Sequence, residues 1–378
     1  MQKKRKVVII GSAYPLRGGG ISTFNERLAK AYNVNGDQAI IYNFSLQYPS
    51  VFFPGSTQYS NEAAPEGLNI ITKINSINPF NWLIVGREIR KLKPDIVIVR
   101  FWIPFMAPCL GTICRIIRKK GIKVVAITDN ILPHEKKFFD RPLVSYFVNS
   151  IDSFVTMSKS VLNDLKTFDQ KKPKKLTVHP LYDNFGEPIS QEKALKNINL
   201  SPAYKYILFF GFIREYKGLD LLLKAFADPA IQKLNLKLLV VGEFYSDSQP
   251  YIILIEELGI NDKVILHNEF VPNTEIVNYF CSASLVVQPY KDATQSGITQ
   301  IAYHFNKPMI TTNVGGLAEI VPDNKVGFVV TPDSKDISKA ILKFFNNNLE
   351  ATFIENIKVE KKRFSWDKML SAIDEVNS

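Results

Sequence analysis

The chain has 378 residues, more than a single hydrophobic core usually organises, so two domains are expected. Hydrophobic residues make up 46% of it, yet no stretch of about 18 uninterrupted apolar residues predicts a transmembrane helix. The net charge of +11 comes without a helix-turn-helix, RRM or zinc-finger pattern, which argues against nucleic acid as a partner. The three cysteines are odd in number and lack metal-ligand spacing, which favours a cytoplasmic protein.

Short apolar runs alternate with amphipathic segments, a pattern typical of α/β folds with parallel sheets. In the first half, buried strands are predicted at Val7–Ile10, Ala39–Tyr42, Asp95–Val99, Val124–Ile127 and Phe154–Thr156. In the second half, they are predicted at Ile207–Phe210, Lys237–Val241, Val264–Leu266, Leu285–Gln288, Met309–Thr311 and Gly327–Val330. Helical patterns lie between them, for example at Ser22–Tyr32, Ile84–Leu92, Leu219–Phe226 and Thr274–Ser282.

A polar stretch near residues 186–204 separates the two series of strands. We therefore expect an N-terminal domain of residues 1–185 and a C-terminal domain of residues 186–363, each a doubly wound, Rossmann-like sheet, facing a cleft. Ligands of such sheets bind at the carboxyl ends of the strands. A last amphipathic helix is predicted in residues 364–378, with Ser365 as its N-cap.

Three glycines, Gly18 to Gly20, follow the first strand and open the first helix. Glycine allows the backbone to approach a ligand closely. The segment is not a dinucleotide fingerprint, because Thr23 stands where G-x-G-x-x-G requires its last glycine.

An aromatic segment, Arg100–Phe105, follows the strand at Asp95–Val99. Three interpretations of it stay open. Its aromatic rings, such as Trp102, would stack on the apolar face of a bound sugar, or the segment packs under a loop. Alternatively it forms a lipid-facing wedge with apolar residues further along, namely Leu110, Ile113, Ile116 and Ile117.

Basic residues gather in the segments 115–123 and 171–175. Charge runs usually belong to a solvated surface, which is one interpretation. The other is peripheral association with an anionic membrane, such as the inner face of the cell membrane, where each basic residue contributes roughly 1 kcal/mol.

The segment from Asp129 to Glu135 follows another strand, Val124–Ile127. His134 is placed to reach a sugar hydroxyl at this strand end, although a lone histidine is often structural. Asp129 would orient His134 or bind sugar hydroxyls itself.

Two segments of the second half predict sites for phosphate. The loop Gly211–Gly218 carries Arg214 and Lys217 after a strand, where two cations can neutralise a diphosphate; exposed surface cations are the alternative. Further on, Ser296–Gly297 opens a helix after the strand at Leu285–Gln288, and free N–H groups at a helix N-terminus bind anions. Two such sites in one domain indicate a nucleotide diphosphate.

Together these motifs resemble those of the retaining GT-B glycosyltransferases of family 4, over nearly the whole chain. The resemblance implies transfer of a hexose from a nucleotide-diphosphate sugar to a saccharide or lipid-linked saccharide in polysaccharide or glycoconjugate assembly. It also implies that no metal cofactor is needed, that the first domain binds the acceptor, and that the last helix crosses back to that domain.

The resemblance assigns roles to individual residues. Catalytic roles fall to Arg214, Lys217 and His134. Donor binding falls to Gly19, Gly20, Gly211, Gly242, Glu243, Val271, Thr294, Gln295, Ser296, Gly297, Ile298 and Thr299. Acceptor-side roles fall to Asp129, Asn130, Arg100 and Trp102.

The sequence departs from the family pattern at four positions, one of which is Asp129 in place of the first histidine of the family's HN…PHE loop. Ala293 and Ile301 stand where the family has two glutamates, of which the second holds the ribose hydroxyls. Phe212 stands where an arginine often follows the glycine, so Arg214 would take that role. A non-catalytic GT-B binding subunit and a nucleotide-sugar epimerase therefore remain alternatives.

Overall fold

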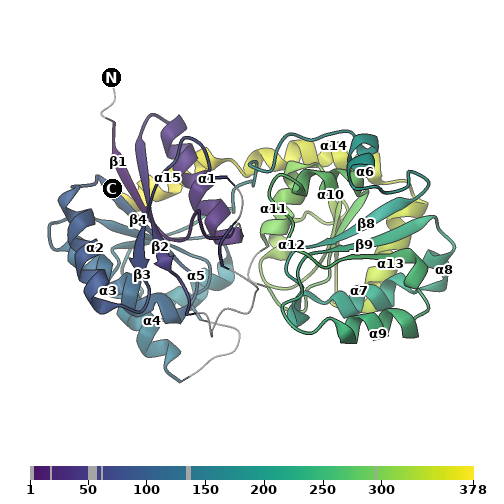
Figure 1. Cartoon of the computed structure of the whole chain (residues 1–378), viewed down its shortest axis with the longest axis horizontal. Helices are drawn as coiled ribbons and strands as arrows, with labels where there is room; N and C mark the ends of the chain where they lie inside the picture. Colours follow the sequence, from purple (N-terminus) through teal and green to yellow (C-terminus); the bar gives the residue numbers. More distant parts are fainter. Residues whose placement is uncertain (1–3, 18, 50–57, 61–62, 133–137, 294–295) are drawn as a thin grey trace. The chain divides into compact units, whose positions relative to one another are not determined.

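The computed structural model describes residues 4–17, 19–49, 58–60, 63–132, 138–293 and 296–378 (Figure 1). The chain divides into two compact units. Unit 1 comprises Met1–Pro180 and Phe364–Ser378, and unit 2 comprises Leu181–Arg363. Residues 181–185, which the sequence assigned to the first domain, belong to unit 2.

In the described part of unit 1, seven parallel strands form one sheet, in the order β3-β2-β1-β4-β5-β6-β7. Their bounds are β1 (Lys6–Ile10), β2 (Gln38–Leu46), β3 (Asn69–Asn75), β4 (Ile96–Phe101), β5 (Val124–Thr128), β6 (Ser153–Thr156) and β7 (Lys174–Leu176). The five predicted strands are confirmed. The two missed strands are β3 and β7, which lie at the sheet edges and are only partly buried.

The described helices of unit 1 are α1 (Gly20–Val34), α2 (Pro79–Lys91), η2 (Pro104–Met106), α3 (Ala107–Arg118), α4 (Asp140–Val148), α5 (Lys159–Lys166) and α15 (Trp366–Asn377). Helices α2 to α5 share one apolar core with the strands, on one face of the sheet. On the other face α15 packs beside α1, with the Trp366 ring 5.0 Å from that of Phe24. An ion pair of 2.7 Å between Arg5 and Asp374 ties α15 to the start of β1. Ser365 is the N-cap of α15, as predicted.

Unit 2 contains, among its described residues, a sheet of six parallel strands in the order β10-β9-β8-β11-β12-β13. They are β8 (Lys205–Phe210), β9 (Leu236–Val241), β10 (Val264–His267), β11 (Leu285–Gln288), β12 (Met309–Thr312) and β13 (Gly327–Val330), which confirms all six predictions. The helices are α6 (Gln191–Asn197), η3 (Glu215–Lys217), α7 (Leu219–Phe226), α8 (Pro229–Gln232), α9 (Gln249–Glu257), η4 (Asn261–Lys263), α10 (Ile276–Ser282), α11 (Gly297–His304), α12 (Leu317–Ile320), α13 (Ser334–Asn346), α14 (Glu350–Glu360) and η5 (Lys361–Arg363).

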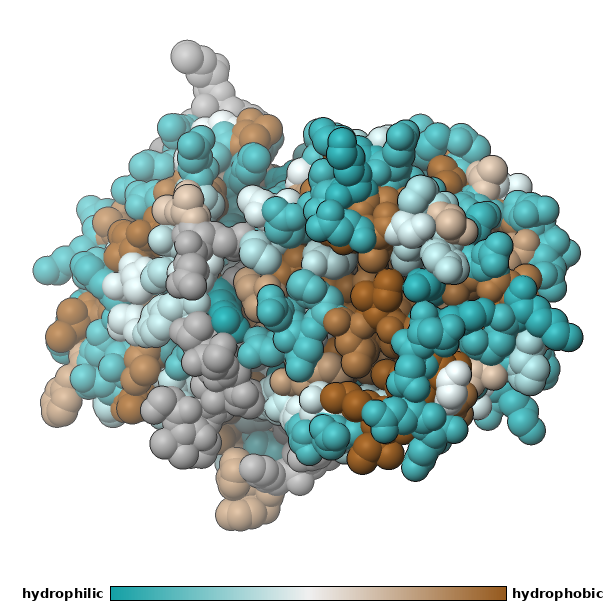
Figure 2. Space-filling model, turned by 45° about the vertical axis from the view of Figure 1, so that its right-hand side comes forward, coloured by the Kyte–Doolittle hydropathy of each residue, from teal (hydrophilic) through white to brown (hydrophobic). Residues whose placement is uncertain are grey.

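The central strands of both sheets are buried on both faces, which is why they form unbroken apolar runs in the sequence. Figure 2 shows one face of the molecule, on which hydrophilic side chains predominate and apolar ones gather in a few places. No helix in the described part of the chain is long and apolar enough to cross a membrane. The three cysteines are free and buried.

The strand order places a switch point in each sheet. In unit 1 the order reverses between β1 and β4, and in unit 2 between β8 and β11. At such points the loops that leave neighbouring strands diverge to opposite faces and leave room for a ligand at the carboxyl edge. The glycine segment and the aromatic segment follow β1 and β4. The basic loop and the loop leading to α11 follow β8 and β11.

Candidate active site

The basic loop of unit 2 is fastened to the neighbouring strand end. The N–H of Ile213 donates to the carbonyl of Glu243 at 2.9 Å, and the N–H of Tyr245 donates back to Ile213 at 3.0 Å. Arg214 lies exposed beyond this bridge, with its guanidinium 3.9 Å from the centre of the Tyr245 ring. A cation held over an aromatic face keeps a defined position at the surface.

Lys217 is a buried cation at the end of the same loop. Among the described residues no carboxylate forms an ion pair with it. Its ammonium lies 5.8 Å from the centre of the Tyr290 ring and 3.1 Å from the position that a Cβ on Gly211 would occupy. Burial, and then the charge of Arg214, lower the pKa of Lys217 to about 7. Such an unpaired buried charge costs stability, and groups of this kind gather at functional sites.

Gly218 joins this loop to the strand across the switch point. Its φ is +68°, and a Cβ on it would lie 2.0 Å from the carbonyl oxygen of Pro289, just after β11. Two further contacts hold the loops together: Lys291 donates its N–H to the carbonyl of Tyr216 at 2.7 Å and pairs with Asp220 at 2.9 Å. The loops after β8 and β11 are therefore held against each other by direct contacts.

Gly218→Ala should destabilise the protein by more than the roughly 1–2 kcal/mol that a left-handed backbone costs a non-glycine residue, because the methyl group also meets a backbone carbonyl. Gly259→Ala is the matched control, since Gly259 has a φ of +64° and open space around its Cβ position. Urea unfolding of both variants measures the difference. Equal losses would contradict the close packing of Gly218 on Pro289.

The start of α11 lies against the same loop. Ser296 is its N-cap residue, and the hydroxyl of Ser296 is 3.3 Å from that of Tyr290 rather than bonded to the helix. The Ile298 side chain lies 3.3 Å from the Cβ position of Gly211, and Gly297 would meet the Tyr182 ring at 2.7 Å if it carried a Cβ. The first N–H groups of a helix have no partner within the helix and carry partial positive charge. The helix start and Lys217 therefore bring positive charge to one place.

Buried amides lie behind this helix start. Thr299 is fully buried and donates its hydroxyl to Gln288 at 3.0 Å. The amide nitrogen of Gln288 and both polar side-chain atoms of Gln300 have no hydrogen-bond partner in the described part of the chain. Buried polar atoms of this kind are places for ordered water.

The two positions where the family has glutamates hold apolar residues here, and both of these residues are buried. Ala293 is buried in a small cluster with Tyr290 and Leu317, and Ile301 is buried on α11. Neither position therefore offers a hydrogen-bond acceptor from its side chain.

The predicted donor residues do not all meet at one point. Gly242, with φ +137°, touches Gly211 so closely that a Cβ would lie 2.3 Å from the Gly211 carbonyl oxygen. Val271 is buried after β10, and Glu243 contacts the basic loop through its backbone. The structure thus brings Gly211, Lys217, Gly242 and Ile298 together. Thr294 and Gln295 lie outside the described residues.

In unit 1, Arg100 and Asp129 are paired with each other. The guanidinium donates to both carboxylate oxygens at 2.5 Å and lies 3.7 Å from the centre of the Phe24 ring. Arg100 is buried, and its third nitrogen, Nη1, has no hydrogen-bond partner among the described residues. The buried side-chain oxygen of Asn130 likewise has no hydrogen-bond partner in the part of the chain that the structure describes. His134 lies outside the described residues, so its predicted pairing with Asp129 remains untested.

Gly19 is the N-cap residue of α1, and Gly20 is the first residue of that helix. Gly19 has an extended backbone with φ −176°, and none of the described residues places an atom within 4 Å of the position of its missing Cβ. Neither backbone strain nor crowding within the described structure explains this glycine. Open space above a helix start is consistent with the approach of a ligand.

Part of the aromatic segment packs within unit 1. Trp102 donates its indole N–H to the hydroxyl of Tyr48 at 2.8 Å and stands edge-on to Phe44. The lipid-facing wedge is wrong for most of its members, because Leu110, Ile113 and Ile117 are buried in the core. Ile116 is partly buried and packs over Gly86 of α2.

Part of the basic charge is engaged within the protein. Arg118 pairs with Asp152 at 2.6 Å, and Lys174 pairs with Asp169 at 2.8 Å. Arg115 donates to Ser150 at 2.8 Å. Arg115, Arg118 and Lys174 therefore have structural roles.

Three tyrosines around the basic loop were missed by the sequence analysis: Tyr182 against Gly297, Tyr245 under Arg214, and Tyr290 beside Lys217. They come from three loops far apart in sequence. No spacing in the chain could have indicated their convergence.

The two sheets, each with a switch point that carries its motifs, define the GT-B class of fold. HepE of Anabaena, solved in complex with UDP, aligns over 98% of both chains with a TM-score of 0.73 at 16% identity, which bears on the fold alone. Family models match the sequence in both units: "Glycosyltransferase Family 4" over residues 18–181 and "Glycosyl transferases group 1" over residues 190–360. The chain belongs to the family 4 glycosyltransferases.

Two relatives in sequence agree with this assignment. An uncharacterised glycosyltransferase of Methanocaldococcus jannaschii is 26% identical over 243 residues, which is 62% of each chain. The capsular polysaccharide biosynthesis glycosyltransferase CapM of Staphylococcus aureus is 26% identical over 289 residues, covering 70% of this chain and 73% of CapM. The chain thus spans less than two thirds of the first relative's length.

Proposed function

We propose that this protein is a retaining glycosyltransferase that moves a hexose from a nucleotide-diphosphate sugar to a saccharide or lipid-linked saccharide acceptor. The observation that carries the proposal is Lys217, a buried cation without a carboxylate partner among the described residues, beside the start of α11. A diphosphate would supply the missing negative charge. The UDP complex of HepE supports a nucleotide-sugar donor, and the role of CapM in capsular polysaccharide biosynthesis supports a saccharide acceptor.

In the proposed reaction the bond between the sugar C1 and the diphosphate oxygen breaks, and the diphosphate leaves with its electron pair. Lys217, Arg214 and the N–H groups of Ser296, Gly297 and Ile298 would stabilise the charge that develops on it. The acceptor hydroxyl forms the new bond to C1 on the same face and gives its proton to the departing phosphate oxygen. The product therefore keeps the anomeric configuration of the donor.

Two cations would do the electrostatic work that a metal ion does in other transferases, so we propose that transfer needs no metal. Ribose would be held without carboxylates at positions 293 and 301, with Thr294 and Gln295 as polar candidates. On the acceptor side, His134 and Asn130 are the candidates for binding sugar hydroxyls, and the Gly19–Gly20 turn would admit donor phosphate or acceptor. Arg100 and Asp129 would position this region through their ion pair.

The test is transfer from UDP-, GDP- and ADP-hexoses to a panel of saccharide and lipid-linked saccharide acceptors, with EDTA present. Acceptor-dependent release of nucleoside diphosphate, and a product whose anomeric configuration matches the donor by NMR, are expected. Release of nucleotide with an altered free sugar and no acceptor would indicate an epimerase. Binding without any turnover would favour the non-catalytic subunit.

Affinity for a nucleotide sugar should fall as pH rises above 7. Burial and Arg214 lower the pKa of Lys217 to about 7, so the unliganded protein loses this proton above that pH, and a neutral amine no longer attracts the diphosphate. The loss should approach tenfold per pH unit. Nucleotide sugars are suited to the measurement, because both phosphates are esterified and keep their charge across this range. Calorimetry from pH 6 to about 9 measures the slope, which Lys217→Met should abolish; a flat profile in the unaltered protein would contradict this origin.

A further inference from the structure

Helix α2 carries apolar side chains on two faces. Val85 and Ile89 are buried in the core of unit 1. On the outside, Phe80 is 77%, Ile84 61% and Leu83 36% exposed. A helix that only covers a core carries apolar residues on one stripe, and large side chains exposed together on a second stripe mark a binding surface.

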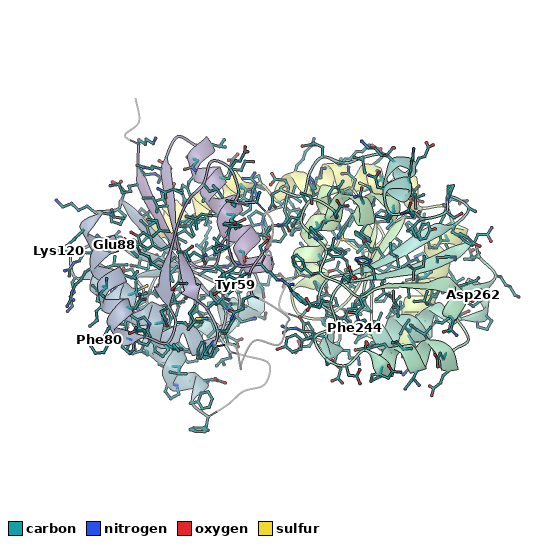
Figure 3. All side chains as sticks on the ribbon, in the orientation of Figure 1. Tyr59, Phe80, Glu88, Lys120, Phe244 and Asp262 are labelled. Carbon is teal, nitrogen blue, oxygen red and sulfur yellow. The ribbon has the colours of Figure 1, made fainter. Side chains whose placement is uncertain are left out.

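The same outer stripe becomes basic in the second half of the helix. Arg87 and Lys91 follow Phe80 and Ile84 at helical spacing and are exposed. Lys119 and Lys120 lie at the end of the adjacent α3, which packs tightly on α2 where Ile116 covers Gly86. Figure 3 shows Phe80 and Lys120 on the outer edge of this unit, both pointing away from the sheet.

These four cations keep their charge available. In the described part of the chain none of Arg87, Lys91, Lys119 and Lys120 forms an ion pair. The neighbouring carboxylate, Glu88, is occupied by Lys73 at 2.9 Å and by the Tyr42 hydroxyl at 3.0 Å. Ile77, just before α2, is exposed as well. The surface made of Ile77, Phe80, Leu83, Ile84 and these four cations, here called the α2 face, is thus both apolar and positively charged.

We propose that the α2 face docks the protein on an anionic lipid bilayer. In this arrangement α2 lies in the plane of the interface, with Phe80, Leu83 and Ile84 among the acyl chains near the headgroups. The four cations contact lipid phosphates, and each adds to the attraction.

A lipid surface fits the α2 face better than a second copy of this chain. A symmetric contact through this face would bring four unpaired positive charges against four others, which opposes association. The proposal differs from the wedge considered from the sequence, whose α3 residues are mostly buried. It is independent of the donor site, because none of its residues belongs to unit 2.

The experiment is co-sedimentation of the full chain with phosphatidylcholine vesicles, either alone or with about one third phosphatidylglycerol. The apolar half is tested with Phe80→Ser/Ile84→Ser, matched by Ile253→Ser/Val359→Ser, which removes exposed apolar side chains of unit 2. The charged half is tested with Arg87→Glu/Lys91→Glu, matched by Lys224→Glu/Lys233→Glu on unit 2, where both lysines are exposed.

Binding to anionic vesicles that weakens with salt, and that falls at least about tenfold in both α2 variants but not in the controls, is the expected result. Absence of binding by the unaltered protein would overturn the proposal, as would α2 variants that bind like their controls. Light scattering that shows an oligomer lost only in Phe80→Ser/Ile84→Ser would reassign the face to self-association. Nucleotide titration of every variant keeps this test separate from that of the proposed reaction.

Discussion

Replacing Lys217 with methionine should lower the rate of transfer by roughly 10²- to 10³-fold, the usual cost of losing one group that stabilises the leaving charge. The same change should leave the melting temperature unchanged or higher. Lys217 is a buried cation without an ion pair among the described residues, and an apolar side chain of similar length removes the cost of desolvating it. Loss of function with gain of stability separates a binding role from a structural one.

Lys224→Met is the matched control, since Lys224 is exposed on α7 and should affect neither quantity. Steady-state transfer rates and thermal melting of both variants are the measurements. A Lys217→Met protein that melts at a clearly lower temperature, or turns over at a near-normal rate, would show that the lysine serves the fold rather than the donor.

Replacing Asp129 with asparagine should cost about 3–5 kcal/mol of unfolding free energy, because it leaves the buried Arg100 without its counter-charge. The partial exposure of Asp129, at 20% of its side chain, moves the expectation toward the lower end of that range. Chemical denaturation measures the loss. Glu355→Gln on α14 serves as control, since its pair with Lys358 is largely exposed and should be worth less than about 1 kcal/mol.

A loss as small as that of Glu355→Gln would mean that water or an unseen partner satisfies Arg100. If Asp129→Asn stays stable but loses affinity for the acceptor, Asp129 contacts the sugar directly, as the family resemblance suggested. The two readouts therefore distinguish positioning from contact.

The strands were predictable because a parallel sheet buries both faces and leaves continuous apolar runs. The edge strands β3 and β7 were not predicted, because their residues are half-exposed and include both polar and apolar types, as in the sequence Lys174-Lys175-Leu176. The basic loop could be placed because a glycine, two cations and a second glycine follow an apolar run directly.

Contacts between distant segments could not be predicted. The pairing of Arg100 with Asp129 depends on β4 and β5 being neighbours, and the sequence offered each residue separately as an acceptor ligand. The exposed face of α2 could not be predicted for a similar reason. The apolar residues of this helix fit a helical pattern, and only their burial in the structure shows which of them lie outside the core.

The most direct test of the donor site is calorimetric titration of UDP, GDP and ADP into the unaltered protein and the Arg214→Ala variant. We expect base-selective binding to the unaltered protein and an affinity at least about tenfold lower in the variant, because the variant loses a charge-assisted contact to phosphate. Equal binding by both proteins, or no binding of any nucleotide, would contradict a donor site at the loop between Gly211 and Gly218.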